Sequence, residues 1–326
     1  GGADLAFVFK GMSKLLNNPL QAGASYLPAS VKEFGCVQEL LILLWKLCDE
    51  NKDFLGYSQR SCDINELVVP ILLGMHDARK DPSKIGLIHI STFILLLLSG
   101  ERNFCVNLNA AYVARGTRDI PYFKGNNADL LYIVYHRLMI EGSKQLDSLY
   151  DCWLTTMSNV SPYIKTFCLL AASRVAGVFE LFAKPGRLIS TENNMRYLIF
   201  VLEIFNNAIQ YQYEGNPHLI YQILRRKKAF AELSKLVEDP AAAVAAVPED
   251  AAFKPTVEWL KRWTEQLPLQ PCMRLLQHLH PQLEDFCQQG NVNDEGVVVD
   301  FLKTTTMVGL LPVPHAILIR KYQQNE

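Results

Sequence analysis

The densest group of metal-ligating side chains lies near the C-terminal end of the sequence. The group consists of Cys272, His278, His280, Glu284 and Cys287. Positions 280, 284 and 287 would share one face of a helix, and imidazole, carboxylate and thiolate are all ligands that zinc accepts. Pro281, however, is expected to begin that helix and to leave His280 at its mouth. Because no zinc-type spacing is present, we interpret the two histidines as a surface pair and predict no metal site.

Sequence motifs of catalysis and nucleotide binding do not occur. The chain has no G-x-S-x-G nucleophile elbow, no G-x-x-x-x-G-K-[ST] phosphate loop and no G-x-G-x-x-G dinucleotide motif. We therefore predict a protein that is not an enzyme and has no cofactor. A hydrolase or transferase with an unrecognised active site remains the alternative, because catalytic triads assemble from residues far apart in sequence.

The densest positive charge is a run of four basic residues, Arg225, Arg226, Lys227 and Lys228. As a functional site, the run would contact anionic lipid headgroups or an acidic partner, and each basic residue adds about 1 kcal/mol near such a membrane. As a structural feature, it would end a helix over 217–227, whose C-terminal carbonyls favour cations. The structural interpretation is favoured, because a charged, solvated helix end is common.

A long stretch without helical periodicity, residues 105–125, is the second candidate site. Loops of this length are uncommon in compact domains and are often functional. The side chains that would contact a partner are Tyr112, Arg115, Arg118 and Tyr122. The favoured alternative is an ordered loop that packs on the helices through its large apolar side chains. Those side chains are Tyr112, Ile120, Tyr122 and Phe123.

The elements that position these residues are predicted to be helices. The most apolar run, from Ile85 to Leu98, is shorter than the about 20 residues that span a membrane. Asp81 and Pro82 before it form a typical start of a soluble helix. We therefore predict a core helix here. Helices are predicted over 4–17, 31–49, 64–78, 82–99, 127–141, 144–158, 162–183, 192–212, 217–236, 257–267, 271–289, 294–304 and 313–322.

Two local patterns add detail to these helices. Asp63 and Glu66 have the spacing of a capping box, in which each side chain satisfies a backbone N–H at the helix start. Pro70, inside the same helix, predicts a kink or a break.

Composition bounds the class of protein. Of the 326 residues, 49% are hydrophobic and 20% charged, and the formal net charge is -1, which gives no attraction to nucleic acid. Eight cysteines form no C-x-x-C pair and most lie in apolar stretches, which predicts buried thiols in a reducing compartment. The glycosylation pattern at Asn159 is attributed to chance, since no secretory signal is present. The chain begins at Gly1 without methionine and is expected to be a fragment.

Residues 238–255, "EDPAAAVAAVPEDAAFKP", have little to bury and are predicted to be a non-helical linker. The predicted domains are a helical array over 1–238, the linker over 239–255 and a C-terminal helical segment over 256–326 that packs on the array. A succession of paired amphipathic helices with short joints predicts an all-α, helical-repeat fold of the armadillo or HEAT kind.

Four long phrases, in this order, resemble one family. They are "QELLILLWKLCDENKDFL" (38–55), "LVVPILLGMHDARKDPSKIGLIHISTFILLLLSGERNFCVNLN" (67–109), "IFNNAIQYQYEGN" (204–216) and "GLLPVPHAILIRKY" (309–322). The sequence resembles the high-temperature-induced dauer formation protein family, which is distantly related to dymeclin. The similarity runs from Phe7 to Tyr322 and covers the C-terminal half of the family's usual chain.

The resemblance implies a cytoplasmic protein that is peripheral on Golgi and trans-Golgi membranes and takes part in sorting cargo into dense-core vesicles. It implies a non-enzymatic scaffold with protein partners of the secretory pathway and without catalytic residues. The family's long polar insertion is reduced here to 239–255. Its N-terminal acylation signal does not transfer, because Leu5 and Ala6 stand where Ser or Thr is needed. Membrane association is thus expected through parts of the parent protein outside this chain.

Overall fold

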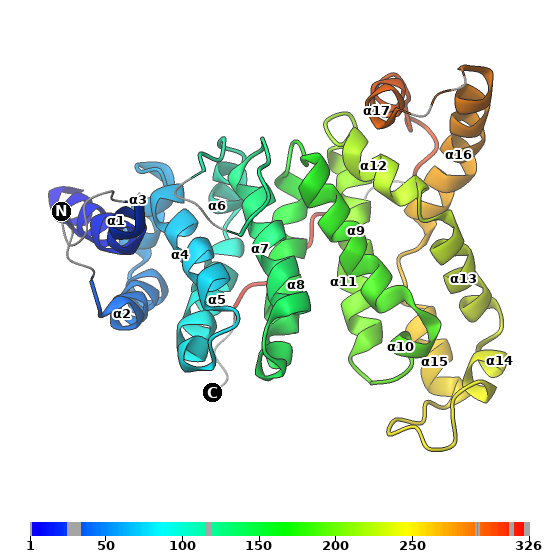
Figure 1. Ribbon diagram of the computed structural model, residues 1–326, viewed down its shortest axis with the longest axis horizontal. Helices are drawn as coiled ribbons and strands as arrows, with labels where there is room; N and C mark the ends of the chain where they lie inside the picture. The colour runs from blue at the N-terminus through cyan, green and yellow to red at the C-terminus, as the bar shows by residue number, and fades with distance from the viewer. Residues whose placement is uncertain are drawn as a thin grey trace. The chain divides into compact units, whose positions relative to one another are not determined.

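The computed structural model describes residues 2–24, 34–114, 119–290, 292, 294–312 and 316–322. Within these ranges the protein consists of α-helices and three short 3₁₀-helices, with one isolated β-bridge and no β-strand (Figure 1). The prediction of an all-α fold is confirmed. The chain divides into two compact units, Gly1–Ile164 together with Ile319–Glu326, and Lys165–Leu318.

The first unit contains the helices α1 to α8. They are α1 (Gly2–Ala24), α2 (Val37–Glu50), α3 (Lys52–Arg60), α4 (Asn65–Ala78), α5 (Ile85–Ser99), α6 (Arg102–Asn107), α7 (Asn127–Glu141) and α8 (Tyr150–Val160). The 3₁₀-helices are η1 (Pro82–Lys84), η2 (Lys144–Leu149) and η3 (Ser161–Tyr163). The long helices form two rows, since α1 packs on α4 and α4 on α7, while α2 packs on α5 and α5 on α8. The pairs α4 and α5, and α7 and α8, join the rows, which is the stacking of helix pairs found in helical-repeat proteins.

The second unit contains the helices α9 to α17. They are α9 (Leu169–Ala183), α10 (Pro185–Leu188), α11 (Asn194–Tyr211), α12 (Pro217–Leu224), α13 (Lys227–Glu238), α14 (Pro240–Ala245), α15 (Val257–Thr264), α16 (Gln270–Gly290) and α17 (Glu295–Lys303). Helix α9 packs on α11, α12 and α13, and α16 packs on α11 and α12. Three phenylalanine rings from α9, α11 and α13 meet in its core, with Phe179 stacked on Phe230 at 4.5 Å.

Several predicted helices differ from the observed ones. The predicted helices 82–99 and 144–158 begin as 3₁₀-helices, 162–183 is interrupted before Leu169, and 217–236 is divided at Arg225 and Arg226. The prediction of a helix over 313–322 is wrong for its described part, 316–322, which contains no helix. The short helices α3, α6, α10 and α14 are not among the predicted ones. Both stretches predicted to be non-helical contain helical residues, from α6 and from α14.

Pro70 does not break α4, and the reason lies in α1. A proline has no N–H, so the carbonyl four residues earlier, that of Glu66, loses its partner within the helix. The side-chain amide of Asn17 donates to this carbonyl at 2.9 Å. The Glu66 carboxylate accepts from Ser13 at 2.9 Å and does not close the predicted capping box, although Asp63 accepts from the N–H of Asn65. Contacts between helices therefore replace the local bonds that the sequence predicts.

Helix α5 packs as the predicted core helix of the first unit. The stretch Pro82–Ser99 is, among the described residues, the one helix long and apolar enough to cross a membrane by length and composition. It contacts α2, α4 and α8, and Ile88, Ile94 and Leu95 are fully buried. The Thr92 hydroxyl accepts from the Trp153 indole at 2.9 Å and donates to the Ile88 carbonyl, so this buried hydroxyl is satisfied inside the protein.

Candidate functional site

The loop between α6 and α7, residues 108–126, is closed at its base by main-chain bonds. Ala111 and Asn126 form the antiparallel bridge, and the N–H of Tyr112 donates to Gly125 at 2.9 Å. Asn126 and Asp129 form a capping box that begins α7. The side chain of Asn127 donates to the Ala110 carbonyl at 2.9 Å. The two ends of the loop are thus fixed together at the start of a helix.

The aromatic side chains of the loop do not all pack as predicted. Tyr112 and Phe123 stack with their ring centroids 5.1 Å apart. Tyr122 is 86% exposed and Val113 is 72% exposed, so the prediction that Tyr122 packs on the helices is wrong. Phe123, the next residue, stacks on Tyr112 instead. Consecutive side chains of an extended segment point to opposite sides, so Tyr122 points away from this stack. Arg115 and Arg118, also predicted to contact a partner, lie outside the described residues.

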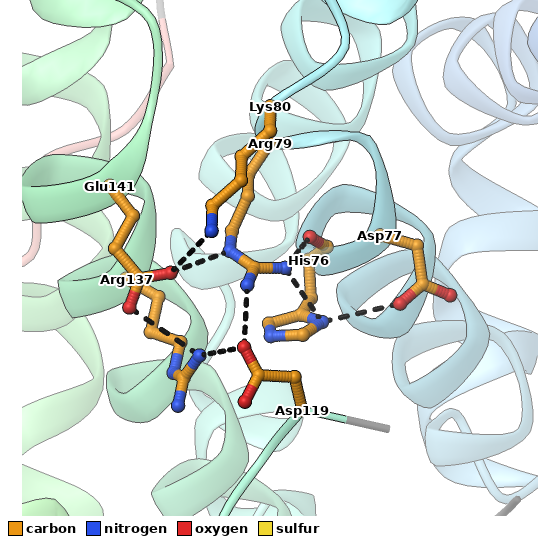
Figure 2. Close-up of polar contacts among 7 residues, drawn as sticks. All are labelled: His76, Asp77, Arg79, Lys80, Asp119, Arg137 and Glu141. Carbon is orange, nitrogen blue, oxygen red and sulfur yellow. Dashed lines mark hydrogen bonds and ion pairs between the residues drawn. The ribbon is translucent and has the colours of Figure 1, made fainter. Parts of the chain in front are cut away.

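An ionic cluster ties the middle of this loop to α4 and α7 (Figure 2). We define the cluster as His76, Asp77, Arg79, Lys80, Asp119, Arg137 and Glu141. Asp119, from the loop, accepts from Arg79 at 3.0 Å and from Arg137 at 2.9 Å. Glu141, at the end of α7, accepts from Arg79 at 2.9 Å and lies 3.4 Å from Arg137. Two arginines from different helices therefore share two carboxylates, one of which belongs to the loop.

Burial makes this pairing specific. The side chains of Arg79 and Arg137 are only 8% and 10% exposed, whereas that of Asp119 is 74% exposed. A guanidinium so far from water needs anionic partners, because it cannot be deprotonated and an unpaired buried charge is costly. The Arg79 guanidinium also donates to the His76 carbonyl at 2.8 Å, at the C-terminal end of α4 where the helix favours a cation.

The arginines keep both carboxylates ionised. The hydrogen bond and charge of Arg137, with the charge of Arg79, lower the pKa of Asp119 from its usual value. Burial alone would raise the pKa of Glu141, but the hydrogen bond from Arg79 and the charges of Arg137, Arg79 and Lys80 together lower it. Neither carboxylate can therefore act as a general acid near neutral pH. The cluster positions the loop and supplies no group for proton transfer.

The sequence gives little sign of this cluster. Asp119 lies next to the predicted contact residue Arg118, but its partners are 40 and 18 residues away along the chain. The one local signal is the spacing of Arg137 and Glu141, which places them on one helix face. Pairs with this spacing are common on exposed helix faces, so the sequence does not predict that Arg137 is buried. The structure shows it.

The basic run lies on a turn between two helices and not at one helix end. Arg225 and Arg226 follow α12, where the helix favours them, whereas Lys227 and Lys228 open α13, where it does not. Arg225 pairs with Glu295 at 2.9 Å, and Arg226 pairs with Glu180 at 3.3 Å and donates to Gln222. Two of the four basic residues thus pair with carboxylates. Lys227 and Lys228 are exposed, and Nζ of Lys227 lies 3.2 Å from Nδ1 of His280.

The histidine pair lies on one continuous helix. Pro281 falls inside α16, so the prediction that it begins a helix is wrong, and His280 lies on the side of α16 with its Nδ1 atom 3.3 Å from Glu284. No group of three or more His, Cys, Asp or Glu side chains within the described residues is arranged to hold a metal ion.

The cysteines are only partly buried. Cys48, Cys105 and Cys272 are buried, and burial raises the pKa of Cys48 and Cys105 to about 12. Cys36 is exposed, and all eight are free thiols. The prediction of buried thiols therefore holds for these three residues.

These features define the class of protein. It is an all-α protein with stacked helix pairs, in which an ionic cluster anchors a surface loop. The family model described as "Dymeclin: Dyggve-Melchior-Clausen syndrome protein" matches residues 2–326. The chain belongs to the dymeclin family.

Individual relatives agree with this assignment. Protein HID1 of Homo sapiens is 37% identical over 416 residues, covering 99% of this chain and 52% of the relative. Protein HID1 of Dictyostelium discoideum is 27% identical over 446 residues, covering 99% of this chain and 49% of the relative. A Ubp5-interacting protein of Schizosaccharomyces pombe is 23% identical, covering 72% of this chain and 26% of the relative.

The chain thus spans about half the length of the HID1 proteins that it matches. These alignments are longer than the chain itself, so the relatives carry inserted residues within the matched region. None of the three names is that of an enzyme. No solved structure matches the chain.

Proposed function

We propose that this chain is a non-enzymatic scaffold that binds protein partners in the secretory pathway. In this proposal it acts at the cytoplasmic face of Golgi and trans-Golgi membranes, in the formation of dense-core vesicles and the sorting of their cargo. Its membership of the dymeclin family supports a role of this class. The name of the fission yeast relative, which states that it interacts with Ubp5, supports the binding of proteins by this fold.

The observation that carries the proposal is the loop 108–126. Two large apolar side chains, Val113 and Tyr122, face solvent on a loop whose position buried arginines fix. Apolar and aromatic side chains on an anchored segment suit a binding surface, because less conformational entropy is lost when a partner binds.

Affinity capture tests this surface. The tagged chain is used as bait in cytosol from secretory cells, beside a variant with Val113→Ser and Tyr122→Ser. The matched control is Val308→Ser, which removes another exposed valine, in the second unit. We expect secretory-pathway proteins that the wild type and the control retain and the loop variant loses. Identical captures by all three baits would contradict the assignment of this loop.

The cellular location needs a separate experiment, because the chain spans about half of its HID1 relatives. The full parent protein and this chain are each tagged and imaged with a trans-Golgi marker. We expect the parent to overlap with the marker and the chain alone to be largely dispersed, since membrane association is proposed to come from other parts of the parent. A parent protein that never overlaps with Golgi markers would contradict the proposed location.

A further inference from the structure

The last described residues of the chain form an extended strap on the first unit. We call Ile319–Tyr322 the strap; it belongs to the first unit, although the residues before it belong to the second. The strap ends beside α5 (Figure 1). The N–H of Arg320 donates to Oδ1 of Asn159 at 2.8 Å, and Nδ2 of Asn159 donates to the Arg320 carbonyl at 2.8 Å. One carboxamide thus pairs with both main-chain groups of one residue, as a neighbouring β-strand would.

Asn159 is held ready for this pairing. It lies on α8, it is fully buried, and its Nδ2 also donates to the Ser99 hydroxyl at 3.0 Å. Ser99 in turn donates to the Leu96 carbonyl, which fixes the orientation of the amide. Buried polar atoms need partners, so an amide oriented in this way fits an extended main chain. The burial also leaves no room for a glycan on Asn159, consistent with its glycosylation pattern being chance.

The side chains of Lys321 and Tyr322 contact an acidic and an aromatic side chain of the first unit. Nζ of Lys321 lies 3.6 Å from the carboxylate of Glu101, and the ring of Tyr322 lies 6.3 Å from that of Phe93 on α5. The main chain of Lys321 passes over Gly100, where an added Cβ would lie 3.7 Å from the Lys321 Cα atom. The surface thus combines main-chain pairing with one acidic and one aromatic contact.

A hollow lies beside the last residues of the strap. It has a volume of about 450 Å³, and Lys321 and Tyr322 form part of its wall. The rest of its lining comes from α2, α3, α5 and the segment that leads into α6, including Asp49, Arg60 and Glu101. The strap and the hollow therefore lie side by side on the first unit.

We propose that the first unit has a binding groove for extended peptides, in which Asn159 binds the peptide main chain and the strap is the resident intramolecular ligand. The ligands of this groove are extended peptides with a basic residue followed by an aromatic residue. The strap closes the groove until such a peptide displaces it. This groove is separate from the loop 108–126, so either proposal can fail without the other.

The strap competes strongly because it is part of the same chain. A tethered segment acts at an effective concentration on the order of millimolar, so a free peptide at micromolar concentration will not displace it. The variant Arg320→Pro weakens the strap without changing α8, because proline has no N–H to donate to Asn159. Leu318→Pro is the matched control, since among the described contacts the Leu318 N–H donates no hydrogen bond.

The probe is a fluorescent peptide with the sequence AILIRKY, residues 316–322, and fluorescence anisotropy measures its binding to the complete chain. We expect Arg320→Pro to bind it at least about tenfold more tightly than the wild type and Leu318→Pro. A peptide with glutamate in place of the lysine should bind several-fold more weakly to Arg320→Pro, because it meets Glu101. Equal binding by the wild type and a folded Arg320→Pro, or equal binding of the two peptides, would overturn the proposal.

Hydrogen exchange on the wild type gives a result even if Arg320→Pro does not fold. The Arg320 amide should exchange more slowly than the Leu318 amide, because only the former is bonded to Asn159. Unlabelled AILIRKY at millimolar concentration should speed its exchange at least twofold, since the freed strap is open to water. The control peptide has proline in place of the arginine and should have no such effect. An Arg320 amide that is unprotected, or unchanged by the peptide, would refute the groove.

Discussion

The two stretches with the weakest helical patterns, residues 105–125 and 238–255, are held in different ways. The first has main-chain bonds at its base and an anchor of two buried arginines on Asp119. The second contains α14, capped by Asp239 and packed on α13 and α15, and an edge-to-face contact of Phe253 with Trp259. Its alanines are largely exposed or half-buried. Contacts of different kinds thus hold the two stretches, and we expect the buried charges to hold the loop more firmly than the short helix holds the alanine-rich segment.

The largest effect should come from damaging the core of the first unit, to which the loop 108–126 belongs. Leu95→Asp places a carboxylate at a fully buried position of α5. We expect a loss of more than about 4 kcal/mol in the free energy of unfolding, or aggregation. Urea unfolding measures this loss. Leu43→Asp, at a leucine of α2 that is half exposed, is the control and should cost about 0.5 kcal/mol or less.

Removing one buried arginine should loosen the loop without unfolding the unit. Arg79→Met keeps most of the side-chain volume and removes its bonds to Asp119, Glu141 and the His76 carbonyl. We expect a loss of about 1–3 kcal/mol in the free energy of unfolding and faster cleavage of the loop by protease. Lys46→Met, which removes an exposed ion pair within α2, is the control. A loop that stays protected in Arg79→Met would show that the cluster does not anchor it.

Limited proteolysis of the wild type compares the two stretches directly. Protease should cut within 239–255 before it cuts within 108–126, because main-chain bonds at the base and two buried arginines hold the latter. The resulting pieces should stay together on gel filtration, since α16 packs its buried leucines on α11 and α12. The same experiment tests the predicted domains, the helical array over 1–238 and the C-terminal segment over 256–326. Separation of the pieces would show that the C-terminal segment is an independent domain.

The anchor should weaken in acid. The pKa values of Asp119 and Glu141 are lowered in the folded protein, so their contribution to stability is present above the unfolded values of about 4. It is lost as the pH falls through the lower, folded values, because the native carboxylates must then be protonated. The difference in unfolding midpoint between the wild type and Arg79→Met should therefore shrink below about pH 4. A constant difference down to pH 2 would contradict the ionic interpretation.

The smallest effect concerns the basic run of the second unit. Arg225 and Arg226 are paired with carboxylates, whereas the exposed Lys227, whose Nζ lies 3.2 Å from Nδ1 of His280, and Lys228 have no carboxylate partner among the described contacts. We expect weak flotation with anionic liposomes that about 0.5 M salt abolishes, since salt screens such contacts. Replacing Lys227 and Lys228 by Gln should remove it. Flotation with neutral liposomes that resists salt would instead show that the chain inserts apolar surface into membranes.

Much of the fold is determined by the sequence itself. Three-four spacing in α11 and the cap before α7 are local properties, because a helix satisfies its own backbone and shows its apolar stripe in the sequence. The family can also be identified from the sequence, because long phrases in a fixed order resemble the family even though the sequence does not show which residues are in contact. The observed bounds of α7 agree with the predicted 127–141, because the cap and the periodicity of a helix are local.

Only the tertiary structure decided the features that join distant segments. Residues 316–322 have an apolar pattern compatible with a helix, yet Asn159 supplies the main-chain bonds that hold Arg320 extended. Pro70 remains inside α4 because Asn17 satisfies the carbonyl that proline leaves without a partner. Asp119 anchors its loop because two arginines are buried beneath it. In each case a side chain far away in sequence satisfies a polar group, and local propensity contains no information about such a partner.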